Sequence, residues 1–171
     1  MEQIKRFFHY LLNLEWTEKV QHNCIFCDRA NFSGIAYEDD ELIAVHNRQS
    51  AGQFHFLIMP KSHLVRDIES LNGNHIALLT AMDRVKHHLL QEHCPDLSVS
   101  DVHSGYHRGR RPLLGKIFYP DIVSIHHLHL HVIVRPRRWL QFFKYPTWLP
   151  LMWKSDRQVM QQVQRLAKRD A

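Results

Sequence analysis

The sequence lacks any apolar run that approaches the ~20 residues needed to cross a bilayer. Its first part, Met1 to Lys19, carries Glu2, Glu15 and Glu18 among its basic residues and has no small-residue cleavage site. A signal peptide needs a basic start, an apolar stretch and such a site, and transit peptides are poor in acidic residues. We therefore expect a cytoplasmic or nuclear protein that has no membrane partner.

Cysteine is scarce, and nothing indicates a modular chain. The 171 residues show no internal repeat and no linker, so a single domain over residues 1–171 is expected. There are three cysteines, an odd number, and in a reducing compartment the pair Cys24-x-x-Cys27 is more typical of a metal or redox site than of a disulfide. Two reduced, partly buried thiols remain an alternative. The flanking pattern lacks the strand and helix of a thioredoxin-like redox pair.

Histidine and positive charge are in excess. The formal net charge is +5 and the isoelectric point is about 9.3, which suits an anionic partner but is also common on protein surfaces. Because the chain has 15 histidines, a single histidine says little about function. Only the spacing of several histidines can indicate a site.

Histidine occupies every second position of the segment His127–Ile133, with an aliphatic residue between. Side chains of a strand point alternately to its two faces, so this spacing predicts a strand with three imidazoles on one face. The other face would present Leu128, Leu130 and Val132 to a core. A helix would rotate successive histidines by about 200° and scatter them.

Alternating histidines fit two chemistries. Two of them can bind a metal ion from one strand face. Alternatively, one can attack phosphorus, because imidazole is substantially neutral near pH 7. Its neighbours would then bind phosphate oxygens and pass a proton to the leaving group. A purely structural role is disfavoured, because three imidazoles are costly to bury in a core.

The other apolar patterns predict helices and strands around this segment. Helices are expected over residues 4–16, over 72–93 and after the capping box Ser155-Asp156-Arg157-Gln158. Strands are expected at the end of residues 36–46, after an acidic turn, and over 53–59, 97–104 and 127–134. The first two strands could pair antiparallel, and His55 shares a face with Leu57 on the second.

Three further segments carry weaker signals. Residues 108–116 form a basic loop, which is either simply solvated or in contact with a phosphate backbone. The aromatic residues of 139–153 are expected to cap a core. On the long helix, His87, His88 and His93 are expected to be solvated.

The run His127-Leu128-His129-Leu130-His131-Val132-Ile133 resembles the signature of the histidine triad (HIT) superfamily. Four further segments match the superfamily in order: Cys24-Ile25-Phe26-Cys27, Phe54–Met59, Pro60-Lys61-Ser62-His63 and Ser124. Gly105-Tyr106-His107, the segment 124–129 and the tryptophan-rich tail are most similar to the third Hint branch and to aprataxin. The resemblance covers roughly residues 22–165.

The resemblance implies an α+β fold, in which an antiparallel sheet packs on the long helix with short helices beside it. The amino-terminal helix within 1–20 and the tail 139–171 would be extensions. The implied reaction is hydrolysis or transfer at the α-phosphate of an adenine nucleotide or adenylated small molecule, as in a nucleoside phosphoramidase, without an organic cofactor.

Residue by residue, the resemblance makes His129 the nucleophile that forms a nucleotidyl-histidine, flanked by His127 and His131. His55 corresponds to a fourth active-site histidine and Ser124 to a hydroxyl near the leaving group. Metal-binding members imply a structural zinc ion on two thiolates and two imidazoles. Its ligands would be Cys24, Cys27, His63 and His127.

The chain departs from the family pattern at three places. Asn47 stands where an aspartate usually binds ribose, and Ser50 replaces a proline three residues later. The segment between His107 and Ser124 is longer and carries extra basic residues. Two alternative functions stay open: removal of 5′-AMP from nucleic acid as by aprataxin, and nucleotide binding without turnover. Whether the protein is a homodimer also stays open.

Overall fold

The computed structural model describes residues 24–170 apart from residues 33, 115–116, 120–122 and 124. The expected amino-terminal helix and Ser124 lie outside the described residues. The strands are β1 Ile35–Glu38, β2 Leu42–His46, β3 Phe54–Pro60, β4 Val102–His107, β5 Arg111–Leu114, β6 Ile117–Tyr119, β7 Leu130–Val134 and β8 Trp153–Ser155. The α-helices are α2 Ile76–His93, α3 Arg138–Phe143 and α4 Asp156–Asp170. Short 3-10 helices are η2 Arg29–Asn31, η3 Ile68–Ser70, η4 Gly73–His75 and η5 Val99–Asp101.

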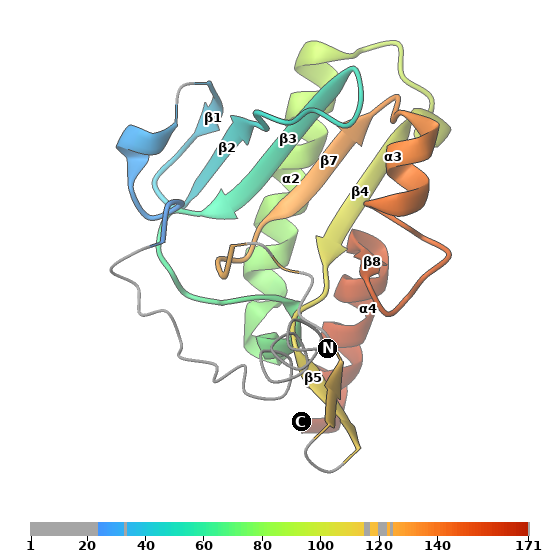
Figure 1. Cartoon of the computed structure of the whole chain (residues 1–171). Helices are drawn as coiled ribbons and strands as arrows, with labels where there is room; N and C mark the ends of the chain where they lie inside the picture. The colour runs from blue at the N-terminus through green and yellow to red at the C-terminus, as the bar shows by residue number, and fades with distance from the viewer. Residues whose placement is uncertain (1–23, 33, 115–116, 120–122, 124, 171) are drawn as a thin grey trace, which may run out of the picture.

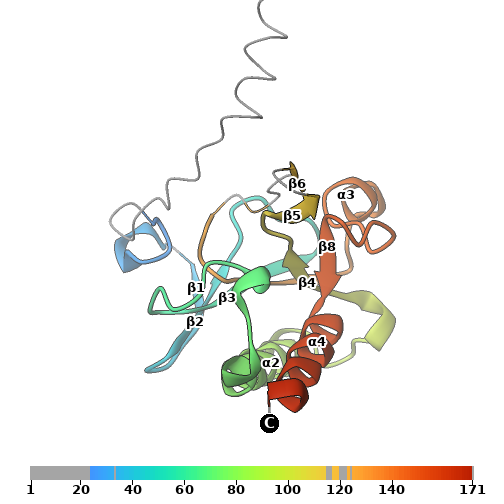
Figure 2. The same ribbon diagram turned by 90° about the horizontal axis from the view of Figure 1, so that it is seen from below.

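Six strands form one sheet in the order β1-β2-β3-β7-β4-β8, and β5 pairs with β6 in a separate hairpin. Every described pairing is antiparallel. Helices α2 and α4 cover one face of the sheet, and α3 lies on the other (Figures 1 and 2). The predicted α+β class, with an antiparallel sheet packed on a long helix, is confirmed.

Alternation along the strands separates an apolar face from a histidine face. Phe56 on β3, Leu130 and Val132 on β7 and Tyr106 on β4 point into the main core. There they meet buried side chains of α2 and α4: Leu79, Met82, Val85, Leu89, Val159 and Val163. Residues at the intervening positions, which include histidines of β3, β4 and β7, point to the opposite face.

Two strands differ from the expectation. Ile35–Glu38 pairs with β2 as a strand of its own, and only Asp39 to Glu41 form the acidic turn. The third strand begins at Val102 rather than Leu97, because η5 precedes it, and it runs on through His107. Short strands beside turns carry too few residues for a periodic signal.

The triad segment is only partly a β-strand. β7 begins at Leu130, so His127 and His129 precede the hydrogen-bonded ladder. Leu128 still points into the main core, and its N–H donates to the Val65 carbonyl at 2.9 Å. The predicted alternation therefore holds beyond the end of the ladder.

The chain after the triad is less buried than expected. Only Tyr145 and Trp153 of its aromatic residues lie in the core, whereas Trp139, Phe142 and Trp148 are exposed. α4 begins with the predicted capping box. The Ser155 N–H donates to Gln158 Oε1 at 3.0 Å, and the Gln158 N–H donates back to Ser155 Oγ at 3.3 Å.

The histidines of α2 are not all solvated. His87 and His88 are exposed as expected, but His93 packs against the rings of Phe54 and Phe56.

Among the described residues, no helix is both long and apolar enough to span a bilayer.

Candidate active site and metal centre

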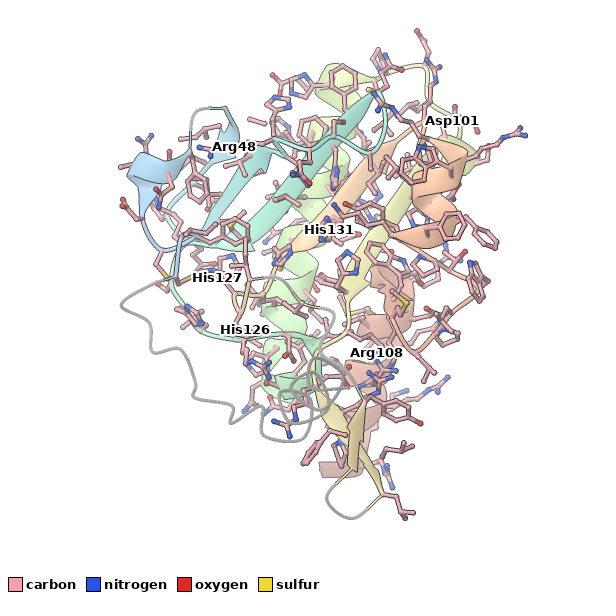
Figure 3. The ribbon with its side chains drawn as sticks, viewed as in Figure 1. Arg48, Asp101, Arg108, His126, His127 and His131 are labelled. Atoms are coloured by element: carbon pink, nitrogen blue, oxygen red, sulfur yellow. The ribbon has the colours of Figure 1, made fainter. Side chains whose placement is uncertain are left out.

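Four imidazoles gather on the histidine face, from strands that the sheet places side by side. His131 on β7 lies opposite Leu57 of β3 and opposite Gly105 of β4. Its ring is 5.2 Å from the His55 ring, 4.9 Å from the His129 ring and 5.0 Å from the His107 ring. His131, which is labelled in Figure 3, is therefore the centre of the cluster.

A chain of hydrogen bonds fixes the tautomers of two of these rings. The Ala51 N–H, which can only donate, is 3.3 Å from His55 Nδ1, so this nitrogen is the acceptor. His55 Nε2 then carries the proton and donates to His131 Nδ1 at 2.9 Å. His131 must carry its own proton on Nε2. That atom is buried and has no hydrogen-bond partner within the described part of the chain.

The tautomer of His129 is the opposite of that of His131. Its Nδ1 is 2.6 Å from the His127 carbonyl oxygen, which can only accept. Nδ1 therefore carries the proton, and the lone pair is on Nε2. The two adjacent imidazoles, whose ring centroids are 4.9 Å apart, thus carry one free lone pair and one N–H donor that has no partner among the described residues. A nucleophile and a donor to an anionic oxygen need this combination.

Burial keeps the cluster uncharged. It lowers the pKa of His55 and of His107 to about 3 each, and it lowers the pKa of His129. Burial also lowers the pKa of His131 well below its usual value, and the neighbouring imidazoles and Lys144 add to the shift. The imidazoles are consequently neutral near pH 7, as nucleophilic attack requires.

The carboxy-terminal tail forms one wall of the site. The Tyr145 ring is 5.3 Å from the His131 ring, and the Trp153 ring is 5.1 Å from the His107 ring. Gly105 permits this packing, because a Cβ there would lie 2.8 Å from the Trp153 ring and 2.3 Å from the Lys154 carbonyl oxygen. Trp153 therefore closes over the strand at a position that only glycine allows.

A second group of side chains lies around His127, the first histidine of the triad, beside the end of β3 at Pro60. The structure brings together Cys24, Cys27, His63 and His127, whose ligand atoms lie within 4.8 Å of one another. Cys27 Sγ is 3.3 Å from His63 Nδ1 and 3.6 Å from His127 Nδ1. Such spacings suit a tetrahedral ion with bonds of about 2.0–2.3 Å.

The partners of this group favour metal binding. His127 Nε2 donates to the Pro60 carbonyl at 2.7 Å, so the lone pair of Nδ1 faces the two sulfur atoms. Burial lowers the pKa of His127 to about 4, which keeps the imidazole neutral. Without metal, desolvation and the adjacent Cys24 raise the pKa of the Cys27 thiol to about 11, so zinc must displace the thiol proton on binding. Two thiols and two neutral imidazoles form a donor set that fits zinc.

Asn47 is close to the cluster, but its side chain is engaged. Its Nδ2 is 3.3 Å from His55 Nδ1, and its Oδ1 accepts from the Gln49 N–H at 3.0 Å. Ser50, at the position of the family's proline, donates its hydroxyl to the Gly52 carbonyl at 2.9 Å. Asn47 thus supports the turn that holds Ala51 against His55.

Two functional candidates were missed in the sequence. His107 ends β4 with a buried Nδ1 that has no hydrogen-bond partner among the described residues. Lys144 is exposed, and its charge lowers the pKa of His55, His107 and His131. Neither residue belongs to a pattern of regular spacing. The one signal in the sequence was the family match at Gly105-Tyr106-His107, which includes His107.

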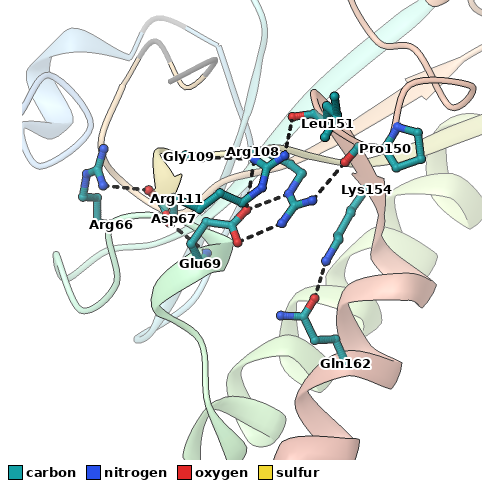
Figure 4. Close-up of polar contacts among 10 residues, drawn as sticks. All are labelled: Arg66, Asp67, Glu69, Arg108, Gly109, Arg111, Pro150, Leu151, Lys154 and Gln162. Atoms are coloured by element: carbon teal, nitrogen blue, oxygen red, sulfur yellow. Dashed lines mark hydrogen bonds and ion pairs between the residues drawn. The ribbon is translucent and has the colours of Figure 1, made fainter. Parts of the chain in front are cut away.

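The expected basic loop is mostly a hairpin, and its arginines have partners within the chain. Arg108 donates to Glu69 from Nε at 2.7 Å and from Nη2 at 3.0 Å (Figure 4). Arg111 donates to the Leu151 carbonyl at 3.1 Å, and Arg110 lies 4.0 Å above the Phe118 ring. Arg108 and Arg111 are therefore structural, and neither is a free contact for a phosphate backbone.

Comparison with known proteins agrees with this geometry. The chain matches a frog relative, the Xenopus tropicalis adenosine 5'-monophosphoramidase HINT3, with 33% identity over 125 residues, or 70% of this chain and 72% of the relative. Zebrafish (Danio rerio) aprataxin is 29% identical over 97 residues, or 57% of this chain, and the match spans only 25% of that longer protein.

A solved structure shares the fold. The histidine triad protein from Clostridium difficile superposes with a TM-score of 0.54 and 20% identity, over 68% of this chain and 94% of that one. Residues 21–141 match the family model described as scavenger mRNA decapping enzyme C-term binding. With the family model matching most of its length, the chain belongs to the histidine triad superfamily.

Proposed function

We propose that this protein is a hydrolase that acts at the α-phosphate of adenylated substrates, as an adenosine 5'-monophosphoramidase does. The observation that carries this proposal is the 2.6 Å hydrogen bond from His129 Nδ1 to the His127 carbonyl. It leaves the lone pair of His129 on Nε2, beside the N–H of His131. The 33% identity to a relative named as such a phosphoramidase supports the substrate class.

The reaction has two steps. His129 Nε2 attacks the α-phosphorus, a nitrogen–phosphorus bond forms, and the bond to the leaving group breaks as that group takes a proton from solvent. His131 Nε2–H donates to a phosphate oxygen as negative charge develops there. Water then attacks the phosphorus, the nitrogen–phosphorus bond breaks, and AMP is released while a proton of the water passes to solvent. The ring of His107, whose buried Nδ1 lacks a partner in the described structure, is 5.0 Å from the His131 ring.

The test is the turnover of adenosine 5'-monophosphoramidate by wild type and by His129→Asn. We expect the variant to lose turnover while keeping its melting temperature, because asparagine retains a polar group but has no nucleophilic ring nitrogen. His88→Asn, on the exposed face of α2, is the matched control. Full turnover by His129→Asn would refute the mechanism, and tight AMP binding without turnover by wild type would indicate a binding protein.

A second candidate is release of 5′-AMP from nucleic-acid ends, as implied by the similarity to aprataxin. It uses the same nucleophile, but Arg108 and Arg111 of the hairpin are engaged within the chain. The assay therefore includes 5′-adenylated nicked DNA at low and high salt. Faster and salt-sensitive turnover of DNA would favour this candidate.

We also propose a structural zinc ion on Cys24, Cys27, His63 and His127. The convergence of the four ligand atoms and the bond from His127 to the Pro60 carbonyl support it. When bound, zinc would hold three distant segments together beside the catalytic histidines. In this proposal His127 stiffens the triad, and His129 stays free to react.

A further inference from the structure

Four exposed aromatic side chains lie on α3 and the turn after it, on the same side of the sheet as the histidine cluster. We define the aromatic ridge as Trp139, Phe142 and Phe143 of α3 with Trp148 of the following turn. These side chains are between 51% and 66% exposed. Large aromatic side chains grouped on a surface commonly mark an interaction site.

The ridge is held rigidly by the segment beneath it. The Phe142 and Trp148 rings stack at 5.0 Å, and Trp148 Nε1 donates to the Phe142 carbonyl at 3.0 Å. On the other side of α3, Gln141 Nε2 is 3.3 Å from His103 Nδ1, and the Arg137 N–H donates to the Ala51 carbonyl at 2.8 Å. The aromatic side chains therefore face outward because α3 is anchored to the sheet.

The sequence segment that carries the ridge has charge of one sign, although Arg135 pairs with Asp101, outside the segment, at 4.0 Å. Residues 122–155 contain no aspartate or glutamate. The same segment holds five basic residues, which are Arg135, Arg137, Arg138, Lys144 and Lys154. Arg137 and Arg138, directly before Trp139, are both exposed. A partner of this surface must therefore offer negative charge together with an apolar layer.

A second apolar projection lies on the same side of the sheet. Leu113, Leu114 and Phe118 are exposed on the β5–β6 hairpin. Seen from below, the hairpin and α3 both lie on the side opposite α2 and α4 (Figure 2). The histidines of β3, β4 and β7 point to this same face of the sheet.

In place of the sequence-based expectation of no membrane partner, we propose that this face docks on the surface of an anionic lipid bilayer. Tryptophan, phenylalanine and leucine side chains flanked by arginine and lysine suit the boundary between headgroups and acyl chains. A platform for nucleic-acid bases is less suitable, because Phe142 and Trp148 already stack on each other and the leucines have no ring. Docking would turn the histidine face of the sheet toward the membrane surface, and it does not depend on which substrate is cleaved.

The probe is a set of vesicles, of phosphatidylcholine alone or mixed with phosphatidylserine, in a co-sedimentation assay with the full chain. We expect wild type to bind the mixed vesicles and to bind less at high salt. Trp139→Ser with Phe143→Ser should abolish binding. Arg137→Gln with Arg138→Gln should weaken it about 25-fold, since each basic residue near such a surface contributes roughly fivefold.

The matched control is Arg165→Gln with Arg169→Gln, which removes the same charge from the exposed side of α4. It should bind like wild type, and all variants should keep their melting temperatures. Failure of wild type to bind the mixed vesicles would overturn the proposal, as would equal weakening by the α4 control. So would preferential binding of single-stranded oligonucleotide through the ridge, or a dimer in solution that the ridge variant separates.

Discussion

At the scale of single residues, the backbone assigns different roles to two similar side chains. His129 and His131 are neighbours on one face, but the His127 carbonyl accepts from the first ring, whereas a donor chain from Ala51 reaches the second. The spacing of the triad predicted that these rings lie together. It could not predict which nitrogen of each ring is protonated, because that depends on atoms of a distant turn.

His55 acts on the reaction through His131, and its replacement tests the donor chain. His55→Phe keeps a ring of similar size but removes the N–H that fixes the His131 tautomer. We expect kcat for adenosine 5'-monophosphoramidate to fall by about 10–100-fold with little change in KM, less than the loss of a direct donor. His46→Phe, on the exposed end of β2, should keep wild-type kcat. A changed KM with unchanged kcat would contradict the positioning role.

The buried histidines also make stability depend on pH. The pKa of His55 and of His107 is about 3 in the folded protein, below the unfolded value of about 6.5. The unfolded chain therefore binds more protons below about pH 6.5, and stability is full above that pH. We expect the free energy of unfolding to fall as pH decreases from about 6.5 toward 3, by about 1 kcal/mol per histidine for each pH unit.

Urea unfolding at several pH values checks this direction. His55→Phe should show a shallower loss of stability in acid than wild type, because it removes one of the depressed pKa values. Stability that rises on acidification through this range would show that these histidines are charged in the folded protein.

At the scale of the elements, long periodic segments were predictable and short ones were not. The long helix and the strand that contains His55 followed from spacing, because apolar residues recur along each. β8 has three residues and β1 has four, so their pairing comes from the sheet rather than from local pattern. The partner of Arg108 is Glu69, which is 39 residues away. The sequence around neither residue predicts this pair.

The contact of β8 with β4 at Gly105 gives a prediction for this part of the sheet. In Gly105→Ala the new Cβ would lie 2.3 Å from the Lys154 carbonyl oxygen and 2.8 Å from the Trp153 ring, so β8 must move. We expect a loss of about 1–3 kcal/mol in the free energy of unfolding, together with reduced turnover, because Trp153 packs against His107.

Chemical denaturation and a turnover assay measure the two effects. Gly34→Ala is the control, since a Cβ there would meet the His46 side chain at 3.5 Å, an ordinary contact. Equal free energies of unfolding for the two glycine variants would show that β8 can move without a loss of stability.

At the scale of the whole molecule, the proposed zinc ion would join segments that are far apart in sequence. Cys24 and His127 are separated by 103 residues, and Cys27 and His63 by 36. If the metal ties them together, a strong chelator should lower the melting temperature by at least about 5 °C, since 1 kcal/mol corresponds to about 2–4 °C for a chain of this size.

Thermal melts with and without chelator, together with elemental analysis, check this prediction. Cys27→Ser should contain less zinc and respond little to the chelator. Cys94→Ser, which alters a cysteine outside the group, should behave like wild type. Freshly purified protein without zinc would count against the metal.

The anchoring of His55 by the Ala51 N–H has a consequence for how this site tolerates sequence change. Of the two donors to His55 Nδ1, one is the side chain of Asn47 and the other belongs to the peptide bond of Ala51, which no ordinary substitution at residue 51 can remove. Only proline, which has no N–H, would break the first link. Substitutions of the side chains around the turn can therefore alter affinity or stability without changing which ring nitrogens of His129 and His131 carry the protons.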